Sequence, residues 1–392
     1  MTQSLIERAQ KVIMPTYSRY PIALESGDGS YLTDVNGKKY LDFVAGIAVD
    51  CLGHNNPGLK AAIAEQCGKI MHVSNLYWTE PQVEAAELLV KASGLDKVFF
   101  CNSGAEANEA ALKMARLYAK QFKSTEAVEI IAMEHSFHGR TYGAISATGQ
   151  PKYQKGLEPL LPGILHVPFN DLDALKAAVS PKTCAILMEP IQGEGGIYPA
   201  DPNYIKAVRK LCDDENILLI FDEVQSGIGR SGKFFAYQHY GIKPDIVCMA
   251  KGIAGGFPMG GIVATDKASQ VFVPGTHATT FGGNPLAAAA SRYVLKTITA
   301  DGFLDEVAEK GNYLRKKLEA LQAKHANIEE VRGMGLMLGV ALSTPVGDVI
   351  QRAMDQGLLL VGAGGVAVRF VPPLTVSKEE IDKAVEIFDQ SL

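Results

Sequence analysis

Residues 245–260 read DIVCMAKGIAGGFPMG, a short apolar run that leads to one charged side chain, Lys251, and then to four glycines. The run has the length and composition of a buried strand. Lysine is rarely buried without a partner or a function. Burial would lower its pKa and favour the free amine, which attacks carbonyl groups. The stretch therefore predicts a strand that delivers either a Schiff-base lysine or one half of a structural salt bridge.

Other short apolar runs surround this stretch in the middle of the chain. They cover residues 97–102, 128–133, 183–190, 217–223 and 260–265. Amphipathic helix patterns, such as residues 105–120 and 203–215, separate them. Such alternation is typical of an α/β domain with a mostly parallel mixed sheet covered by helices. Because ligands bind beyond the carboxyl ends of strands in open sheets, the residues that follow each strand are the candidates for a site.

The two ends of the chain have a different pattern. Asp-Gly and Asn-Gly turns within residues 25–43 predict antiparallel hairpins. Helices are expected at residues 286–298 and beyond, followed by short strands and a last helix whose capping box is Ser377–Glu380. A smaller α+β domain built from both ends is expected. The predicted divisions are residues 1–53 (small domain), 54–285 (large domain) and 286–392 (small domain).

Composition excludes several classes of protein. A net charge of −5 in 392 residues provides no basic surface for nucleic acid. No apolar run is long enough to span a membrane, and the N-terminus lacks a signal region, so a cytoplasmic protein is expected. The six cysteines form no CxxC pair and are expected to be reduced thiols of the core.

Strand 97–102 leads into Ser103, Gly104 and Ala105, and a helix pattern begins at once. A helix N-terminus beside small residues offers free N–H groups and the positive end of a dipole, which suits a phosphate. The alternative is a capped helix without a ligand. Because this turn carries neither a GxGxxG nor a Walker A pattern, a single phosphomonoester is favoured over a dinucleotide or nucleoside triphosphate.

The loop after strand 128–133 carries Phe137, His138 and Arg140. An aromatic ring, an imidazole and a guanidinium suit a flat ring together with a carboxylate. His135 lies three residues before His138, but no third ligand is near, so no metal site is expected. The alternative is a surface loop with a solvated arginine.

Two strands end in carboxylates. Glu189 follows one, and Glu194 lies in the glycine-rich loop behind it, so the pair could perform acid–base work, form salt bridges or act as a movable gate. Asp222 follows an apolar run and needs a cationic partner, because an unpaired buried charge is costly. That partner is either Lys251 or a cofactor.

These groups taken together match the needs of pyridoxal 5'-phosphate (PLP). The cofactor requires a lysine for an imine, a carboxylate for its ring nitrogen, an aromatic neighbour and a phosphate site. Two other classes stay open. A class I aldolase also uses a Schiff-base lysine, but its barrel does not need the Asp222 partner. The second class is a non-catalytic binding protein. Visible absorbance from bound PLP would argue against it.

Nearly the whole chain resembles the class III (ornithine/GABA-type) aminotransferases of PLP fold type I, which are aspartate aminotransferase-like. The motifs that carry the resemblance include LGHNNP, CNSGAEANE, MEPIQGEGG, FDEVQSGIGR, HATTFGGNP and RFVPP. Residue by residue, it implies that Lys251 forms the imine and that Asp222 pairs with the pyridine nitrogen. Phe137 and Val224 would flank the ring, and Gln225 would contact the phenolic oxygen. The other implied cofactor-binding residues are Ser103, Gly104, Ala105, His138, Glu223 and, from the other subunit of a homodimer with shared active sites, Thr280.

The resemblance also implies the substrate-binding residues. Arg140 would hold the substrate carboxylate, with Thr279 beside it. Arg369 would hold the α-carboxylate of glutamate, and Glu194 would pair with Arg369 when the other substrate is bound. The implied set also contains Glu189 and Tyr17.

The resemblance is greatest to family members that transfer the δ-amino group of N2-acetyl-L-ornithine to 2-oxoglutarate in arginine biosynthesis. Ile47 stands where ornithine-specific members carry a tyrosine, and an aliphatic residue suits an N-acylated substrate better. Succinylornithine, succinyldiaminopimelate, ornithine and GABA are the alternative amino donors.

Overall fold

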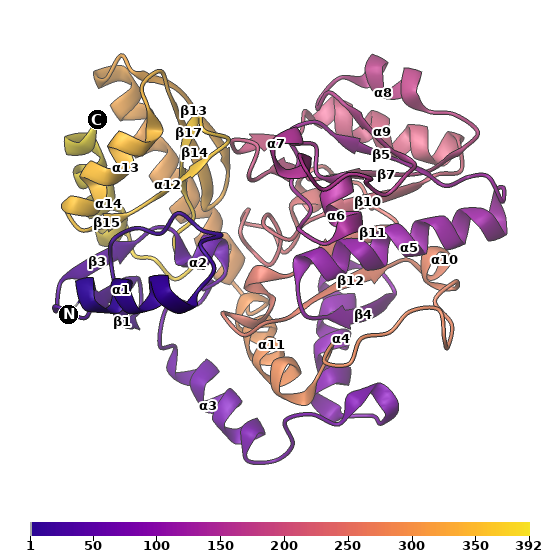
Figure 1. The fold of residues 1–392 in the computed structure, drawn as a ribbon, viewed down its shortest axis with the longest axis horizontal. Helices are drawn as coiled ribbons and strands as arrows, with labels where there is room; N and C mark the ends of the chain where they lie inside the picture. Colours follow the sequence, from indigo (N-terminus) through magenta and orange to yellow (C-terminus); the bar gives the residue numbers. More distant parts are fainter. Residues whose placement is uncertain (1) are drawn as a thin grey trace.

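The computed structural model describes residues 2–392, which form two sheet-containing parts (Figure 1). The larger part is built on a seven-stranded sheet with the order β4-β12-β11-β10-β7-β5-β6. Its strands are β4 (Lys97–Cys101), β5 (Glu129–Met133), β6 (Ile164–Val167), β7 (Thr183–Met188), β10 (Leu218–Asp222), β11 (Ile246–Met249) and β12 (Gly260–Ala264). All pairings are parallel except those of β12 with β11 and β4. The predicted mixed, mostly parallel sheet is confirmed.

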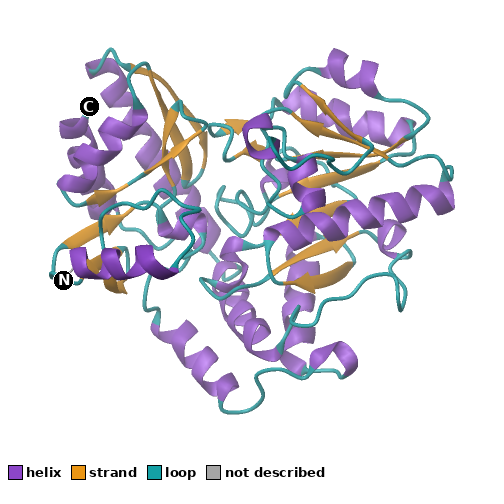
Figure 2. Ribbon diagram, in the orientation of Figure 1, coloured by secondary structure: helices purple, strands orange, loops and turns teal. Residues whose placement is uncertain are grey.

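The larger part also contains helices, several of which cover the sheet or connect its strands (Figure 2). They are α3 (Pro57–Cys67), α4 (Glu80–Ser93), α5 (Gly104–Phe122), α6 (Tyr142–Ala147), α7 (Pro151–Gln154), α8 (Leu172–Ala178), α9 (Pro202–Asp214), α10 (Asp266–Ser269) and α11 (Pro285–Ile298), with the 3₁₀ turns η1 (Ser74–Leu76), η2 (Ala236–His239) and η3 (Lys251–Ala254). A hairpin of two short strands, β8 (Ile191–Gln192) and β9 (Tyr198–Pro199), follows β7. Because the six parallel strands point the same way, the residues after β4, β5, β7, β10 and β11 meet at one edge.

The smaller part joins segments from both ends of the chain, so α1 and α14 both belong to it, on the left of Figure 1. One four-stranded sheet has the order β1-β2-β3-β15 and the other β13-β14-β17-β16. The strands are β1 (Leu24–Asp28), β2 (Tyr31–Asp34), β3 (Lys39–Asp42), β13 (Ile328–Met334), β14 (Met337–Leu342), β15 (Leu358–Leu359), β16 (Val361–Ala363) and β17 (Ala367–Phe370). The helices are α1 (Thr2–Val12), the short α2 (Ala45–Ala48), α12 (Phe303–Lys324), α13 (Val346–Asp355) and α14 (Lys378–Ser391).

The expected N-terminal hairpins and the last helix are confirmed. Strands β1, β2 and β3 pair antiparallel. Ser377 caps α14 by accepting the N–H of Glu380 at 3.1 Å, and Glu380 accepts the N–H of Ser377 at 2.8 Å. We propose the division at residues 53 and 285 as the domain boundaries, although α11, which follows the second boundary, packs against α3 and α4 of the larger part.

Two sequence expectations differ from the structure. Strand β6 was not predicted, because as an edge strand it is only partly buried and lacks a continuous apolar run. Cys67 lies exposed at the end of α3, whereas the other five cysteines are buried as expected. Among the helices of residues 2–392, none combines the length and apolar content needed to cross a bilayer.

Candidate active site

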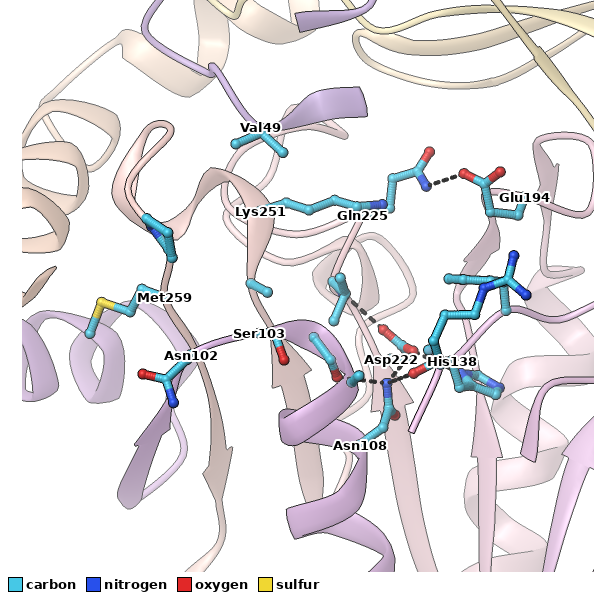
Figure 3. Close-up of a pocket in the computed structure, with 18 of the residues that line it drawn as sticks. Val49, Asn102, Ser103, Asn108, His138, Glu194, Asp222, Gln225, Lys251 and Met259 are labelled. Atoms are coloured by element: carbon cyan, nitrogen blue, oxygen red, sulfur yellow. Dashed lines mark hydrogen bonds and ion pairs between the residues drawn. The ribbon is translucent and has the colours of Figure 1, made fainter. Parts of the chain in front are cut away.

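A cavity of about 380 Å³ lies at the carboxyl edge of the large sheet, between the two parts. It brings together side chains that follow five different strands and lie far apart in the sequence (Figure 3). The predicted site residues that line it are Ser103, Gly104, Ala105, Phe137, His138, Arg140, Glu189, Glu194, Asp222, Val224, Gln225 and Lys251.

Lys251 enters this cavity directly after β11. Its backbone has a φ of 47°, a left-handed conformation that costs energy for a residue with a β-carbon and is concentrated at functional sites. Burial lowers the pKa of Lys251 to about 8, and the charge of Glu194 opposes that shift. Within residues 2–392, no carboxylate lies within salt-bridge distance of its amine, so the alternative of a salt bridge with Asp222 is not found. The lysine extends toward Gln225 instead (Figure 3).

Asp222 ends β10 and is held by three donors. Its Oδ2 accepts hydrogen bonds from Asn108 Nδ2 at 2.8 Å and from His138 Nδ1 at 2.7 Å, and its Oδ1 accepts the N–H of Val224 at 3.0 Å. His138 is fully buried, and its Nε2 has no partner among the described residues. His138 therefore lies behind the carboxylate and orients it. The carboxylate itself lines the cavity.

The N-terminus of α5 forms another wall of the cavity. Ser103 caps the helix by accepting the N–H of Glu106 at 3.2 Å. The N–H groups of Gly104 and Ala105 have no acceptor within residues 2–392. A β-carbon at Gly104 would lie 2.7 Å from Val224 Cγ1, so a glycine is needed where this helix end meets the loop after β10. The free N–H groups provide a site for an anion.

Arg140 lies at the exposed mouth of the cavity. Its guanidinium is 4.0 Å from the ring centre of Tyr153 and 5.5 Å from that of Phe137. The two rings lie nearly perpendicular to each other, at 84°, and cation–π contacts with both restrict the position of the guanidinium. Within the described chain, no carboxylate forms an ion pair with it. Arg140 is therefore available to a carboxylate from solution.

Arg369, on β17, approaches the cavity from the smaller part. It is buried and forms an ion pair with Glu194, and it donates to Gln225 Oε1 at 2.8 Å. Burial alone would raise the pKa of Glu194, but the charges of Arg369 and Lys251 outweigh burial and hold that pKa below its ordinary value. In this arrangement Glu194 and Gln225 both accept from Nη1 of Arg369.

Glu189 anchors two loops at the back of the cavity. It accepts the N–H of Phe137 at 3.1 Å and the N–H of Gly193 at 3.0 Å. Burial raises the pKa of Glu189 to about 7, and the charge of Asp222 adds to the effect. Its two oxygens are thus used to fix the backbone on either side of the cavity.

Some predicted residues lie away from the cavity. Glu223 points to the opposite side and accepts the N–H groups of Ala236 at 2.7 Å and Tyr237 at 2.8 Å. Thr279 does not line the cavity, but its Oγ1 accepts a hydrogen bond at 3.1 Å from Nδ2 of Asn102, which does. Thr280 and Tyr17 are exposed and line other cavities.

The prediction from sequence missed several residues of the site. Asn108 is the most important, because its amide joins Asp222 to the carbonyls of His138 at 2.9 Å and Gly104 at 3.2 Å. Its position four residues after Gly104, on the same face of a helix, was a usable signal. Val49, which follows the left-handed turn of α2, also lines the cavity, and nothing in the sequence indicated this.

These residues fit pyridoxal phosphate. The unpaired N–H groups of Gly104 and Ala105 match a phosphate, and Asp222 matches a protonated ring nitrogen. Lys251 has the lowered pKa that an imine-forming amine requires. The cavity also has the size of a small-molecule site.

Comparisons with known proteins agree with this arrangement. The family described as aminotransferase class-III matches residues 12–392. The chain is 53% identical over 390 residues to the acetylornithine aminotransferase of Caldanaerobacter subterraneus subsp. tengcongensis, with 99% of each chain covered. It is 51% identical to the acetylornithine aminotransferase of Clostridium acetobutylicum, covering 98% of this chain and 100% of that one. The ornithine aminotransferase of Toxoplasma gondii superposes with a TM-score of 0.96 at 31% identity, covering 100% of this chain and 94% of that chain.

The fold and the site thus define a PLP-dependent enzyme of fold type I. One further structure of the Toxoplasma gondii enzyme is described with partial occupancy of PLP at its active site. The chain belongs to the class-III aminotransferases, and its substrates are small molecules.

Proposed function

We propose that the protein is an acetylornithine aminotransferase. It transfers the δ-amino group of N2-acetyl-L-ornithine to 2-oxoglutarate and yields N-acetyl-L-glutamate 5-semialdehyde and L-glutamate. The observation that carries this proposal is the pair of arginines beside Lys251. Arg140 is free of carboxylates, whereas Arg369 is masked by Glu194. Full-length relatives at about 50% identity bear the same activity in their names.

Two arginines of unequal availability suit two substrates of unequal charge. The α-carboxylate of acetylornithine binds Arg140, which places the distant δ-amine near Lys251, while Glu194 keeps Arg369 neutralised. 2-Oxoglutarate has carboxylates at both ends, so one binds Arg140 and the other binds Arg369 after Glu194 moves aside. Each bidentate pair of arginine and carboxylate also fixes the orientation of the substrate.

The residues of the site divide the chemistry among them. Bound pyridoxal phosphate supplies a carbonyl that captures amines and a ring that withdraws electrons from the reacting carbon. Lys251 would take the proton from Cδ of the donor and transfer it to the carbon of the bound cofactor that carries the amino nitrogen, so that the amino group stays behind when the aldehyde leaves. Asp222, oriented by His138, keeps the ring nitrogen protonated. Further contacts to the cofactor come from Ser103, Gly104, Ala105, Phe137, Val224 and Gln225.

The lowered pKa of Lys251 leads to a pH-dependent prediction. The protonated amine cannot attack a carbonyl, so the rate at which apoprotein captures added PLP should rise with pH up to about 8 and then level off. With an ordinary lysine, the capture rate would continue to rise up to a pH of about 10.4. Stopped-flow absorbance measures the capture rate, with Nα-acetyl-lysine as the reference amine. A profile that still rises steeply above pH 9 would contradict a pKa of Lys251 lowered to about 8.

The choice of donor is tested by steady-state kinetics with 2-oxoglutarate. We expect kcat/KM for N2-acetyl-L-ornithine to exceed that for succinylornithine, succinyldiaminopimelate, ornithine and GABA. Ornithine is the second candidate, because an ornithine aminotransferase superposes on the chain with a TM-score of 0.96. A higher kcat/KM for ornithine than for its acetylated form would overturn the assignment and keep the enzyme class.

A homodimer and a cytoplasmic location complete the proposal. Thr280 is exposed and shares a cavity of about 1110 Å³ with Leu76 and Trp78, which are 80% and 92% exposed. Large apolar side chains left in solvent favour burial against a second copy. In such a dimer, Thr280 serves the phosphate site of the partner subunit. A monomeric mass for the active protein in sedimentation would refute this.

A further inference from the structure

Glu194 lies at the tip of a hairpin that crosses between the two parts of the molecule. Strands β8 and β9 pair through Gln192 and Tyr198, which leaves residues 193–197 as the connecting loop. On the side of the larger part, the loop is tied by the N–H of Gly193, which donates to Glu189 Oε1 at 3.0 Å, and by Gln192 Nε2, which donates to the carbonyl of Glu134 at 2.8 Å.

The other end of the loop is tied to the smaller part by Arg332 of β13. Its Nε donates to the carbonyl of Gly196 at 2.8 Å, and its guanidinium lies 3.7 Å from the ring centre of Tyr198. Its Nη1 pairs with Glu330 at 2.7 Å, and the Arg332 side chain is only 7% exposed. A buried guanidinium that stacks on a ring and donates to a backbone carbonyl has little freedom to move.

The register of the small-domain sheet places Arg332 in the same row as Arg369, the arginine that Glu194 masks. Arg332 pairs with Gly339 of β14, and Gly339 pairs with Arg369 of β17. The two arginines are thus two strands apart in one row, at a separation of roughly 10 Å between backbones. Between them, buried Ile197 sits over Gly339, where an added β-carbon would lie 2.9 Å from Ile197 Cβ.

The loop therefore lies across this row, with Gly196 held by Arg332 and Glu194 held by Arg369. The two attachments differ in kind. The first is a contact to the backbone, buried under Tyr198, and no substrate competes for it. The second is an ion pair between Arg369 and Glu194, which lines the cavity, and a substrate carboxylate can take the place of Glu194.

We propose that Arg332 is a positioning residue that fixes the pivot of the Glu194 loop and thereby sets how often Glu194 masks Arg369. The inference rests on the gating role proposed for Glu194. When a dicarboxylate displaces Glu194, the loop turns about Gly196 while Arg332 and Ile197 stay in place. Arg332 touches neither substrate nor cofactor, so its effect is on discrimination between the two half-reactions.

The test compares half-reactions in Arg332→Ala, Glu194→Ala and the double variant. We expect Arg332→Ala to lower the ratio of kcat/KM for acetylornithine to that for glutamate roughly fivefold to tenfold, as the loss of one charge-assisted hydrogen bond allows. Glu194→Ala should lower the same ratio. In the double variant, the loss of Arg332 should add little, because it acts through Glu194.

A second readout is independent of cofactor and chemistry. Hydrogen–deuterium exchange of the segment 193–198 in apoprotein should be faster in Arg332→Ala and unchanged in Glu330→Gln, which removes the exposed ion pair and leaves the bond to Gly196. If Arg332→Ala does not fold, Tyr198→Leu removes the stacking ring and should shift the ratio in the same direction.

The outcomes separate the two proposals. An unchanged ratio in Glu194→Ala would refute the gate and, with it, the role of Arg332. A changed ratio in Glu194→Ala, combined with a fully additive effect of Arg332→Ala or with exchange as slow as in the wild type, would refute the role of Arg332 alone. A loss of thermal stability without a change in the ratio would reduce Arg332 to a structural residue.

Discussion

Lys251→Ala is expected to lower transamination by more than about 10⁴-fold, because it removes the only lysine among the described residues that line the cavity and also the base that moves the substrate proton. The visible absorbance that depends on a lysine linkage should vanish with it. The fold should persist, since alanine also carries a β-carbon and the strain at a φ of 47° is the same for both residues. Half-reactions followed by stopped flow, together with far-ultraviolet circular dichroism, measure both effects.

The matched control for this prediction is Lys233→Ala, which removes an exposed lysine outside the cavity. Its rates should equal those of the wild type. Near-normal turnover in Lys251→Ala would overturn the assignment of the catalytic amine, whatever the identity of the substrate.

Asp222→Asn is expected to have the second-largest effect. An amide retains the shape of the side chain and can still accept the hydrogen bonds of Asn108 and His138 on one oxygen, but it carries no charge to stabilise a protonated ring nitrogen. We expect kcat to fall on the order of 10²- to 10³-fold, as for other groups that stabilise charge in a transition state. Cofactor affinity, measured by fluorescence titration, should also weaken.

Asp245→Asn provides a control of the same type. Asp245 precedes β11 at the opposite edge of the same sheet and holds Arg209 at 2.8 Å and the N–H of Leu219 at 2.8 Å. That variant should lower the free energy of unfolding and leave kcat unchanged. Equal losses of kcat in the two variants would show that Asp222 acts only on stability.

Much of the site could be predicted from the sequence because its residues follow strands. Lys251 and Asp222 come directly after apolar runs, and a parallel sheet brings such positions to one edge whatever the details of packing. The helix that begins at Gly104 could be predicted in the same way, because its pattern starts soon after the apolar run 97–102. The reversed strand β12 was also within the predicted mixed sheet.

Other contacts could not be predicted because they join distant elements. Glu223 is adjacent to Asp222, yet alternation along an extended segment sends it to the opposite side, where it holds the backbone near Tyr237. Asn108 reaches Asp222 only because α5 packs on the sheet at that height. No local pattern encodes such distances.

The sequence by itself determined the order of most strands of the large sheet along the chain, the small residues at the phosphate end, the lysine after β11 and the aspartate that ends β10. These depend on local periodicity and on chain direction, which are properties of short segments. The tertiary structure alone decided that Glu194 masks Arg369 and that Arg332 holds the same loop from the other end of one row of the sheet. That row depends on the register of β13, β14 and β17, which many side chains set together when the two parts of the molecule pack.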